Sequence, residues 1–344
     1  MSSLPLDLHH NVLSRLPAIS LLKLRSVCRK WRDMIDDLHF AAMHATSSVE
    51  SPRILLLPDP RHDADSQFAV NDEFLVTSLS RLAERTLLHV TGASCHGLVC
   101  VQDFRNGATH LFNPLTREIA SLSSVDPSRE PRGCCVIGIG VDHLTSRYKI
   151  VRMRYFIDRF RAEVLDQGSR SWRDIASAPP ALMFIRPVFA AGSIHWKTTP
   201  RGVVRISSFD VAKEEFAWTP CPELQNAHLV DLRGALGLVH CSHGESVDVW
   251  VMKESGRSMK EYSVRVSQPL PPTNHFFFKV LSCRGRKIAL SFYGRCWLYD
   301  AATDELKDVR RPGAAPAILV GSITVSLLSP AKLWNSGVAE IKET

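Results

Sequence analysis

The chain has 344 residues, of which 45% are hydrophobic and 22% are charged. This composition is ordinary for a globular protein and excludes extensive disorder. The net charge of +7 comes from 42 basic and 35 acidic residues spread along the chain. Such a balance favours acidic partners only weakly and does not itself indicate nucleic acid. No apolar run approaches the length of a membrane span.

Nine cysteines are scattered along the chain, and the N-terminal segment MSSLPLDLHH lacks the basic-then-apolar layout of a secretory signal. We therefore expect reduced thiols and a cytoplasmic or nuclear location. Short clusters such as Cys95, His96 and Cys100 lack the spacing of a zinc site, and no Gly-x-Ser-x-Gly or paired-carboxylate motif appears. The sequence thus predicts no metal, no cofactor and no catalytic residues.

The first 45 residues have a helical pattern. Leu8, Val12 and Leu16 recur at the spacing of one helix face. Pro5 suits the start of a helix and Pro17 forces a stop, so the sequence predicts a helix over about residues 6–16.

A second apolar stripe follows over residues 20–31, and a short third helix is expected over about residues 31–37. The stripe contains Leu21, Leu24, Cys28 and Trp31, with Val27 beside it. Three short helices in so small a unit cannot bury all of these faces against each other, so apolar surface is left over for a partner. On the pattern alone, the same residues fit equally well as the core of a small helical bundle.

After residue 50 the pattern changes to short β-branched and aromatic segments, such as HGLVCVQD, YKIVRMRYF and KIALSF, separated by Gly, Pro, Asn and Asp. This pattern predicts a large all-β domain over residues 46–344. A loose repeat runs through it, in which a glycine precedes an apolar strand and a polar turn residue follows further on. The glycines are Gly97, Gly192, Gly237 and Gly285, and the turn residues are Asn113, Asp166, Asp210 and Asp300.

Repeating units of this length are typical of propeller blades. We expect about six blades, with segments 52–58, 68–76 and 317–328 completing the ring. Asn113-Pro114 and Gly138-x-Gly140 are interpreted as turns.

The N-terminal residues resemble the F-box consensus in order and spacing. The resemblance rests on Leu4-Pro5-x-Asp7-Leu8, Val12-Leu13-Ser14-Arg15-Leu16-Pro17, Ser20-Leu21-Leu22 and Val27-Cys28-Arg29-Lys30-Trp31-Arg32. The chain departs from the family at His9-His10-Asn11, where an apolar residue and a glutamate are common.

The remainder resembles the F-box-associated interaction domain of plant proteins. The motifs are Ser94-Cys95-His96-Gly97-Leu98-Val99, Phe112-Asn113-Pro114-Leu115-Thr116-Arg117, Gly138-Ile139-Gly140-Val141-Asp142, Gly192-Ser193-Ile194-His195-Trp196 and Val247-Asp248-Val249-Trp250-Val251-Met252. The resemblance implies a small all-α F-box of three helices (residues 1–45) followed by a kelch-like β-propeller.

The same resemblance implies a function without bond chemistry. The chain would be the substrate-recognition subunit of a Skp-cullin-F-box ubiquitin ligase, binding a Skp-family adaptor through its helices and an unknown protein target through the β domain. Trp31 is the strongest candidate for an anchor of the adaptor interface. The residues assigned to adaptor binding or its support are Leu4, Pro5, Leu8, Val12, Leu16, Leu21, Leu24, Val27, Cys28 and Trp31.

Two other functions stay open at this point: an F-box scaffold or inhibitor acting outside a ligase, and a DNA-binding protein using the basic N-terminal helices. For the target site, the basic window around Tyr148–Arg161 offers Arg152 and Arg154 as weak candidates. Strand alternation places both on one sheet face, which we interpret as a solvated face.

Overall fold

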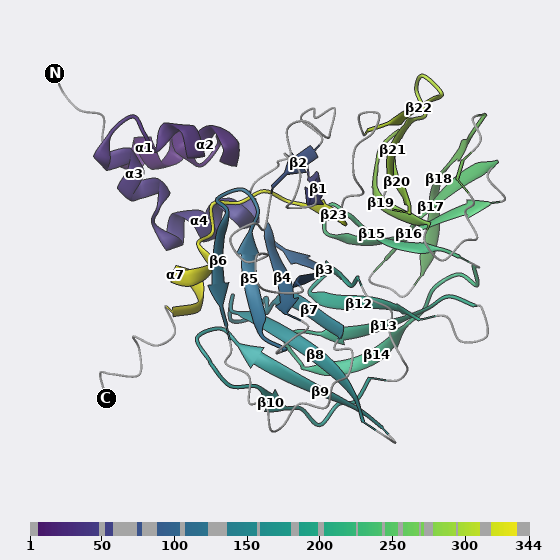
Figure 1. Cartoon of the computed structure of the whole chain (residues 1–344), viewed down its shortest axis with the longest axis horizontal. Helices are drawn as coiled ribbons and strands as arrows, with labels where there is room; N and C mark the ends of the chain where they lie inside the picture. The colour runs from purple at the N-terminus through teal and green to yellow at the C-terminus, as the bar shows by residue number, and fades with distance from the viewer. Residues whose placement is uncertain are drawn as a thin grey trace.

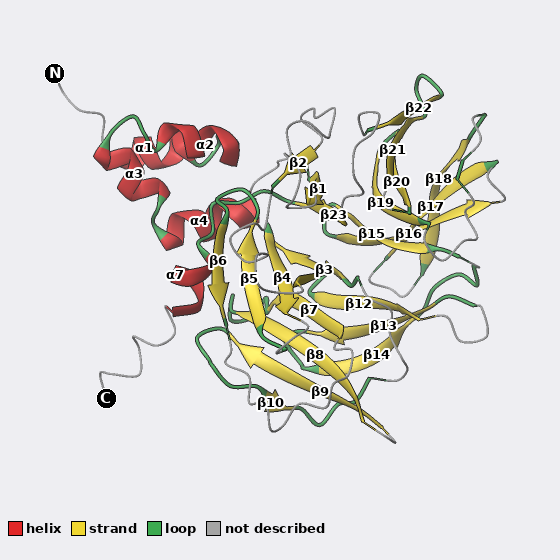
Figure 2. Ribbon diagram, in the orientation of Figure 1, coloured by secondary structure: helices red, strands yellow, loops and turns green. Residues whose placement is uncertain are grey.

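The computed structural model separates the chain into a helical unit and a β domain (Figures 1 and 2). The residues it describes are 6–47, 52–57, 74–77, 88–103, 107–122, 136–156, 159–179, 186–198, 203–224, 226–242, 245–253, 257–267, 270–271, 278–293, 295–309 and 318–335.

The helical unit consists of α1 (Leu6–Leu13), α2 (Ala18–Leu24), α3 (Arg29–Ile35) and α4 (Leu38–Ser47). Our expectation of three helices is therefore wrong. The run over 20–31 is broken before α3, where Cys28 has an extended backbone and its Sγ accepts a hydrogen bond from the Trp31 amide at 3.5 Å. The apolar spacing continues across this break, so periodicity alone could not reveal it. The fourth helix extends past residue 45, where we expected the helical domain to end.

In the part of the chain that the structure describes, the β domain contains five four-stranded antiparallel sheets, each running outward from its first strand. The first holds β3 (Leu88–Cys95), β4 (Leu98–Asp103), β5 (Thr109–Asn113) and β6 (Glu118–Ser121). The second holds β7 (Val136–Val141), β8 (Tyr148–Phe156), β9 (Arg159–Asp166) and β10 (Arg173–Asp174). The third holds β11 (Val188–Ala190), β12 (Ser193–Thr198), β13 (Arg205–Asp210) and β14 (Glu215–Thr219). The fourth holds β15 (His228–Leu232), β16 (Ala235–Ser242), β17 (Ser246–Met252) and β18 (Ser258–Arg265). The fifth holds β19 (Lys279–Arg284), β20 (Lys287–Phe292), β21 (Arg295–Asp300) and β22 (Glu305–Asp308).

A three-stranded sheet joins the two ends of the β domain. In it β1 (Arg53–Leu57) pairs in parallel with β2 (Phe74–Val76) and antiparallel with β23 (Ile318–Ile323). The late strand β23 contacts both β19 and β3, so it closes the ring between the last and the first blade. The domain is a β-propeller, as expected, but our count of about six blades is corrected to five four-stranded blades. The terminal segments form only three strands in the described part of the chain.

Two glycine predictions have different outcomes. Gly97 follows His96 in the β3–β4 hairpin, and both residues have positive φ (78° and 46°), which the two-residue turn requires. Gly138 and Gly140, interpreted as turn residues, lie instead inside strand β7. A Cβ on Gly140 would come within 2.8 Å of Phe189 and Val211 of the next blade, so these glycines serve close packing between blades.

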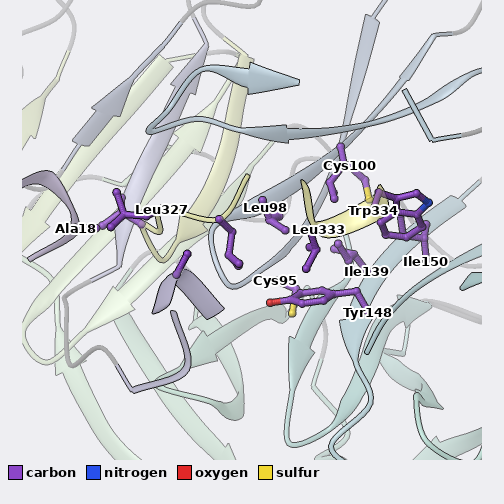
Figure 3. Packing of buried hydrophobic residues seen from close by; sticks show 14 of the residues in the cluster. Ala18, Cys95, Leu98, Cys100, Ile139, Tyr148, Ile150, Leu327, Leu333 and Trp334 are labelled. Carbon is purple, nitrogen blue, oxygen red and sulfur yellow. The ribbon is translucent and has the colours of Figure 1, made fainter. Parts of the chain in front are cut away.

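One hydrophobic cluster connects the helices to the propeller. Leu13, Ala18 and Leu21 belong to the same cluster as Leu98 and Leu111 of the first blade. The C-terminal helix α7 (Pro330–Asn335) lies next to β6 and contributes Leu333 and Trp334 to this cluster. Figure 3 shows Ala18 beside Leu327, and Trp334 near Cys100 and Ile150. The helical unit therefore uses part of its apolar surface to pack on its own β domain.

Candidate functional site

The helical unit exposes apolar side chains on one helix and one loop. Leu8 and Val12 on α1 are 49% and 61% exposed, and Val27 in the loop between α2 and α3 is 61% exposed. We call Leu8, Val12 and Val27 the exposed apolar surface. Cys28, next to Val27, is exposed as well. Large aliphatic side chains left in water cost free energy that contact with a partner would recover.

The other residues assigned to adaptor docking lie deeper. Leu21 is fully buried in the cluster shared with the propeller, whereas Leu16, Leu24 and Trp31 are partly buried and pack against that cluster. Leu16, Leu24 and Trp31 can support the exposed apolar surface. Leu21 is fully buried and cannot contact a partner. Leu4 and Pro5 lie outside the described residues.

The two adjacent histidines of α1 pack on neighbouring aromatic rings. His9 meets Trp31 edge-on at 6.4 Å between ring centroids, and His10 meets Phe40 of α4 at 5.0 Å. One of these rings, Phe40, belongs to α4, a helix that the sequence did not predict. The departure from the F-box consensus at this point thus has a packing role.

An open groove of about 930 Å³ runs between α1, α3 and α4. Its apolar floor is formed by Met34, Phe40 and Met43, and charged side chains such as Lys30 and Asp33 line its sides. The groove could not be predicted without α4, which supplies part of it. The apolar residues of LHFAAM, directly after the third predicted helix, are the signal in the sequence that indicates this fourth helix.

Polar contacts fix α7 between the helical unit and the propeller. Trp334 Nε1 donates to the Ser169 carbonyl at 2.9 Å, and Gln167 Nε2 donates to the Leu333 carbonyl at 3.0 Å, both from the second blade. Lys332 Nζ donates to the carbonyl of Asp36 at the end of α3. The C-terminal helix therefore restrains the position of the helical unit on the ring.

The predicted solvated face around Arg152 and Arg154 does not exist. Both side chains are buried (7% and 8% exposed) and pair with Glu163 of the neighbouring strand at 2.6 and 3.0 Å. The Arg152 guanidinium also lies over the Trp172 ring, 4.2 Å from its centroid. Both arginines lie on one sheet face, as the alternation predicts, but loop residue Trp172 covers this face. Neither arginine is placed to receive an acidic target.

A cavity of about 470 Å³, here called the axial channel, lies among the inner strands β3, β11, β15, β19 and β23. Ala45 and Thr46 of α4 lie at the mouth beside the hairpin turns, together with Arg233 and Arg284. Arg186 lines the channel at the opposite ends of these strands. The mouth at the hairpin turns is thus next to the helices, and the other mouth lies on the rim away from them.

The thiols in the described part of the chain are free. Burial raises the pKa of Cys241 and of Cys296 to about 12, so these thiols stay protonated at neutral pH. No group of three or more potential metal ligands occurs among the described residues. In that part of the chain no helix is both long and apolar enough to cross a membrane.

These features define a class: a small helical unit with an exposed apolar surface, packed against a β-propeller. The F-box domain model matches residues 1–42, and the model of the F-box associated beta propeller domain matches residues 54–291.

Relatives match along most of their length. The chain is 28% identical over 325 residues to the F-box/kelch-repeat protein At3g23880 of Arabidopsis thaliana, covering 87% of this chain and 88% of that protein. It is 30% identical over 317 residues to the F-box protein At3g07870 of the same plant, covering 78% and 74%. The chain therefore belongs to the plant F-box proteins with an F-box-associated β-propeller. This membership supports a general role as a substrate receptor in ubiquitin ligation.

Proposed function

We propose that this chain is the substrate-recognition subunit of a Skp-cullin-F-box ubiquitin ligase, in which the helices bind the adaptor and the propeller holds a protein target. The observation that carries the proposal is the exposed apolar surface of Leu8, Val12 and Val27 on a unit that matches the F-box. Leu16, Leu24 and Trp31 pack against the hydrophobic cluster shared with the propeller and support this surface.

In this proposal the chain contributes position and no bond chemistry. A cullin-bound conjugating enzyme carries the activated ubiquitin, and the receptor raises the effective concentration of target lysines near it. The value of such a receptor depends on a fixed distance between adaptor and target. The contacts of α7 with Asp36, Ser169 and Gln167 support a fixed arrangement of the helical unit and the ring.

We assign target capture to the rim that lies away from the helices. At the hairpin rim, Asn113 donates to the Ser326 and Leu328 carbonyls that lead into α7, and α4 lies against the channel mouth. That side is occupied by the chain itself. The opposite rim carries the connections between blades, and binding residues are commonly found on such loops. The proposal places the complex in the cytoplasm or nucleus.

Affinity capture from plant tissue tests the proposal. We expect the wild-type chain to retain a Skp-family adaptor, a cullin and further proteins. Val12→Asp combined with Val27→Asp should lose the adaptor and cullin and keep the other partners, because charged side chains cannot be buried in an apolar interface without a large cost.

Two other results would support different functions. An adaptor that binds while no captured protein is ubiquitinated would favour the scaffold or inhibitor. A salt-dependent shift of a DNA duplex by the chain would favour DNA binding. An adaptor retained by the double variant would contradict the assigned docking surface.

A further inference from the structure

Basic residues gather where three successive inner strands begin. Arg186 comes just before β11, His228 begins β15 and Lys279 begins β19. Four antiparallel strands return the chain to the end of the blade where it started, so these inner strands all begin at the same rim. The strand β15 contacts both β11 and β19, which brings the three residues together.

A fourth basic residue joins them from the second strand of the third blade. Val188 pairs with His195 in the β11–β12 ladder, so Lys197, two residues beyond His195, lies toward the same end of this ladder as Arg186, two residues before Val188. Burial lowers the pKa of His228, and the charges of Lys197, Lys279 and Arg186 lower it further, as expected for groups that lie in one region. We call Arg186, Lys197, His228 and Lys279 the basic cluster.

The basic cluster has no acidic partner in the described part of the chain, and no acidic group is among the causes that shift the pKa values of its four members. The adjoining segments 180–185, 199–202 and 272–277 contain no Asp or Glu in their sequence. Among the described residues that line the channel the one acid is Asp231, which lies near the end of β15 on the side of the helices and accepts a hydrogen bond from the Gly234 amide.

One member of the cluster presents a buried nitrogen without a partner. His228 Nε2 is buried and unbonded among the described residues, and its ring packs edge-on against Phe278 with centroids 5.6 Å apart. Buried polar nitrogens are normally hydrogen-bonded, so a site with an open donor or acceptor calls for an explanation. A bound oxyanion would supply the missing partner.

Burial and the neighbouring positive charges lower the pKa values of the basic cluster. Loss of solvation, with the charges of Arg186 and Lys197, lowers the pKa of Lys279 to about 8. Burial lowers the pKa of Arg186 to about 10 and also lowers that of Lys197. Burial and the neighbouring cations lower the pKa of His228. Burial is the largest cause of each shift, because the charged form loses its solvation.

We propose that the basic cluster binds a phosphate group at the mouth of the axial channel on the rim away from the helices. Several converging cations call for a ligand with more than one negative charge, and a phosphate ester carries about −1.5 to −2 at neutral pH. The Arg186 guanidinium offers paired N–H groups that match phosphate oxygens, and the lysines act as point charges. A single carboxylate would neutralise less of the cluster.

The phosphate could belong to a free compound or to a phosphorylated residue of a target protein. Both present the same chemistry to the cluster. The site stands apart from adaptor docking, so its failure would leave the proposed receptor role in place, and loss of adaptor binding would leave the site in place.

The test uses the full chain and inorganic tripolyphosphate, titrated by calorimetry at constant ionic strength. We expect saturable binding that Lys197→Met with Lys279→Met weakens about tenfold or more. The matched control, Lys213→Met with Lys307→Met, removes the same charge at side chains that are 73% and 64% exposed, and should bind as the wild type does.

A second measurement distinguishes a loss of anion binding from misfolding of the variant. Without anion, the cluster variant should melt at the wild-type temperature or above it, because two mutually repelling cations have been removed. With tripolyphosphate, the wild type and control should gain melting temperature and the cluster variant should not. Arg186→Gln should show the same loss.

A pool of phosphoserine peptides and its dephosphorylated counterpart distinguish the two sources. Tighter binding of the phosphorylated pool, displaced by tripolyphosphate, assigns the site to a target residue, and tripolyphosphate binding alone assigns it to a free compound. The proposal is overturned if neither probe binds saturably, or if the cluster variant and the control lose affinity equally.

Discussion

Lys332 of α7 donates a hydrogen bond from Nζ to the backbone carbonyl of Asp36, 2.8 Å away and at the other end of the chain. Asp36 caps the C-terminus of α3, so the bond satisfies a carbonyl that the helix leaves open. Because α7 is itself anchored in the first two blades, this contact joins the F-box to the propeller. The two parts are better described as one body than as domains on a linker.

The anchoring of α7 predicts that Trp334→Ala is strongly destabilising. The indole is 4% exposed and its Nε1 donates to the Ser169 carbonyl, so the change leaves a cavity and an unpaired carbonyl. We expect a loss of about 3–5 kcal/mol in urea unfolding. Lys332→Met, which removes one exposed bond, should cost about 1 kcal/mol or less. Equal stabilities for the two variants would contradict the role of α7.

Asn113 should be the most sensitive of the turn residues. Its Oδ1 accepts from the Leu115 and Thr116 amides, and its Nδ2 donates to the Ser326 and Leu328 carbonyls, all in a fully buried position. Asn113→Ala should cost about 2–4 kcal/mol in chemical denaturation, because buried carbonyls lose their partner.

A matched turn residue provides the control for Asn113. Among the described residues Asp300 accepts only from the Ala302 amide, in an exposed turn, so Asp300→Ala should cost about 1 kcal/mol or less. A similar cost at both positions would show that the contact with the chain leading into α7 adds nothing.

Glu214 joins the second and third blades and makes stability depend on pH. It accepts from Arg173 at 2.6 and 2.7 Å and pairs with Lys149 at 2.9 Å, and the Arg173 bonds lower its pKa to about 2. The folded pKa lies below the ordinary value of 4.5, so this contribution is present above pH 4.5 and is lost as the pH falls toward 2.

Removing the charge of Glu214 should therefore reduce the loss of stability at acid pH. Glu214→Gln is expected to lose about 1–3 kcal/mol at pH 7 and to approach the wild type near pH 2. Glu305→Gln, whose partner Lys307 is largely exposed, should follow the wild type throughout. Thermal unfolding across this pH range measures both, and parallel curves for wild type and Glu214→Gln would refute the assignment.

Substitutions of buried and of exposed residues in the helical unit should differ clearly in their cost to stability. Leu21→Ala removes a fully buried side chain and should cost about 2–5 kcal/mol. Val12→Ala alters a side chain that is 61% exposed and should change stability by about 0.5 kcal/mol or less. Denaturant titration decides between them, and a large loss at Val12 would mean that it is packed and not free for a partner.

The sequence revealed features that depend on local chemistry. The stripe of Leu8 and Val12 follows from helical spacing, and the turn roles of Asn113 and Asp210 follow from short polar side chains that accept from nearby amides. Pairing of the first and last β segments was also confirmed, since a ring of repeats needs a closure.

Tertiary contacts account for what the sequence analysis missed. Helices α4 and α7 depend on packing between the helical unit and the ring, and α7 consists of only six residues. The burial of Arg152 depends on Trp172, which lies in a loop. The basic cluster joins residues from 186 to 279 that no spacing rule connects, because only the order of blades brings them together.

The most direct test of the account is calorimetric titration of a purified Skp-family adaptor into the full chain. We predict saturable one-to-one binding by the wild type and a loss of affinity of about 100-fold or more for Val12→Asp with Val27→Asp, with the melting temperature unchanged. Wild-type affinity in this double variant, or no adaptor binding by the folded wild type, would contradict the account.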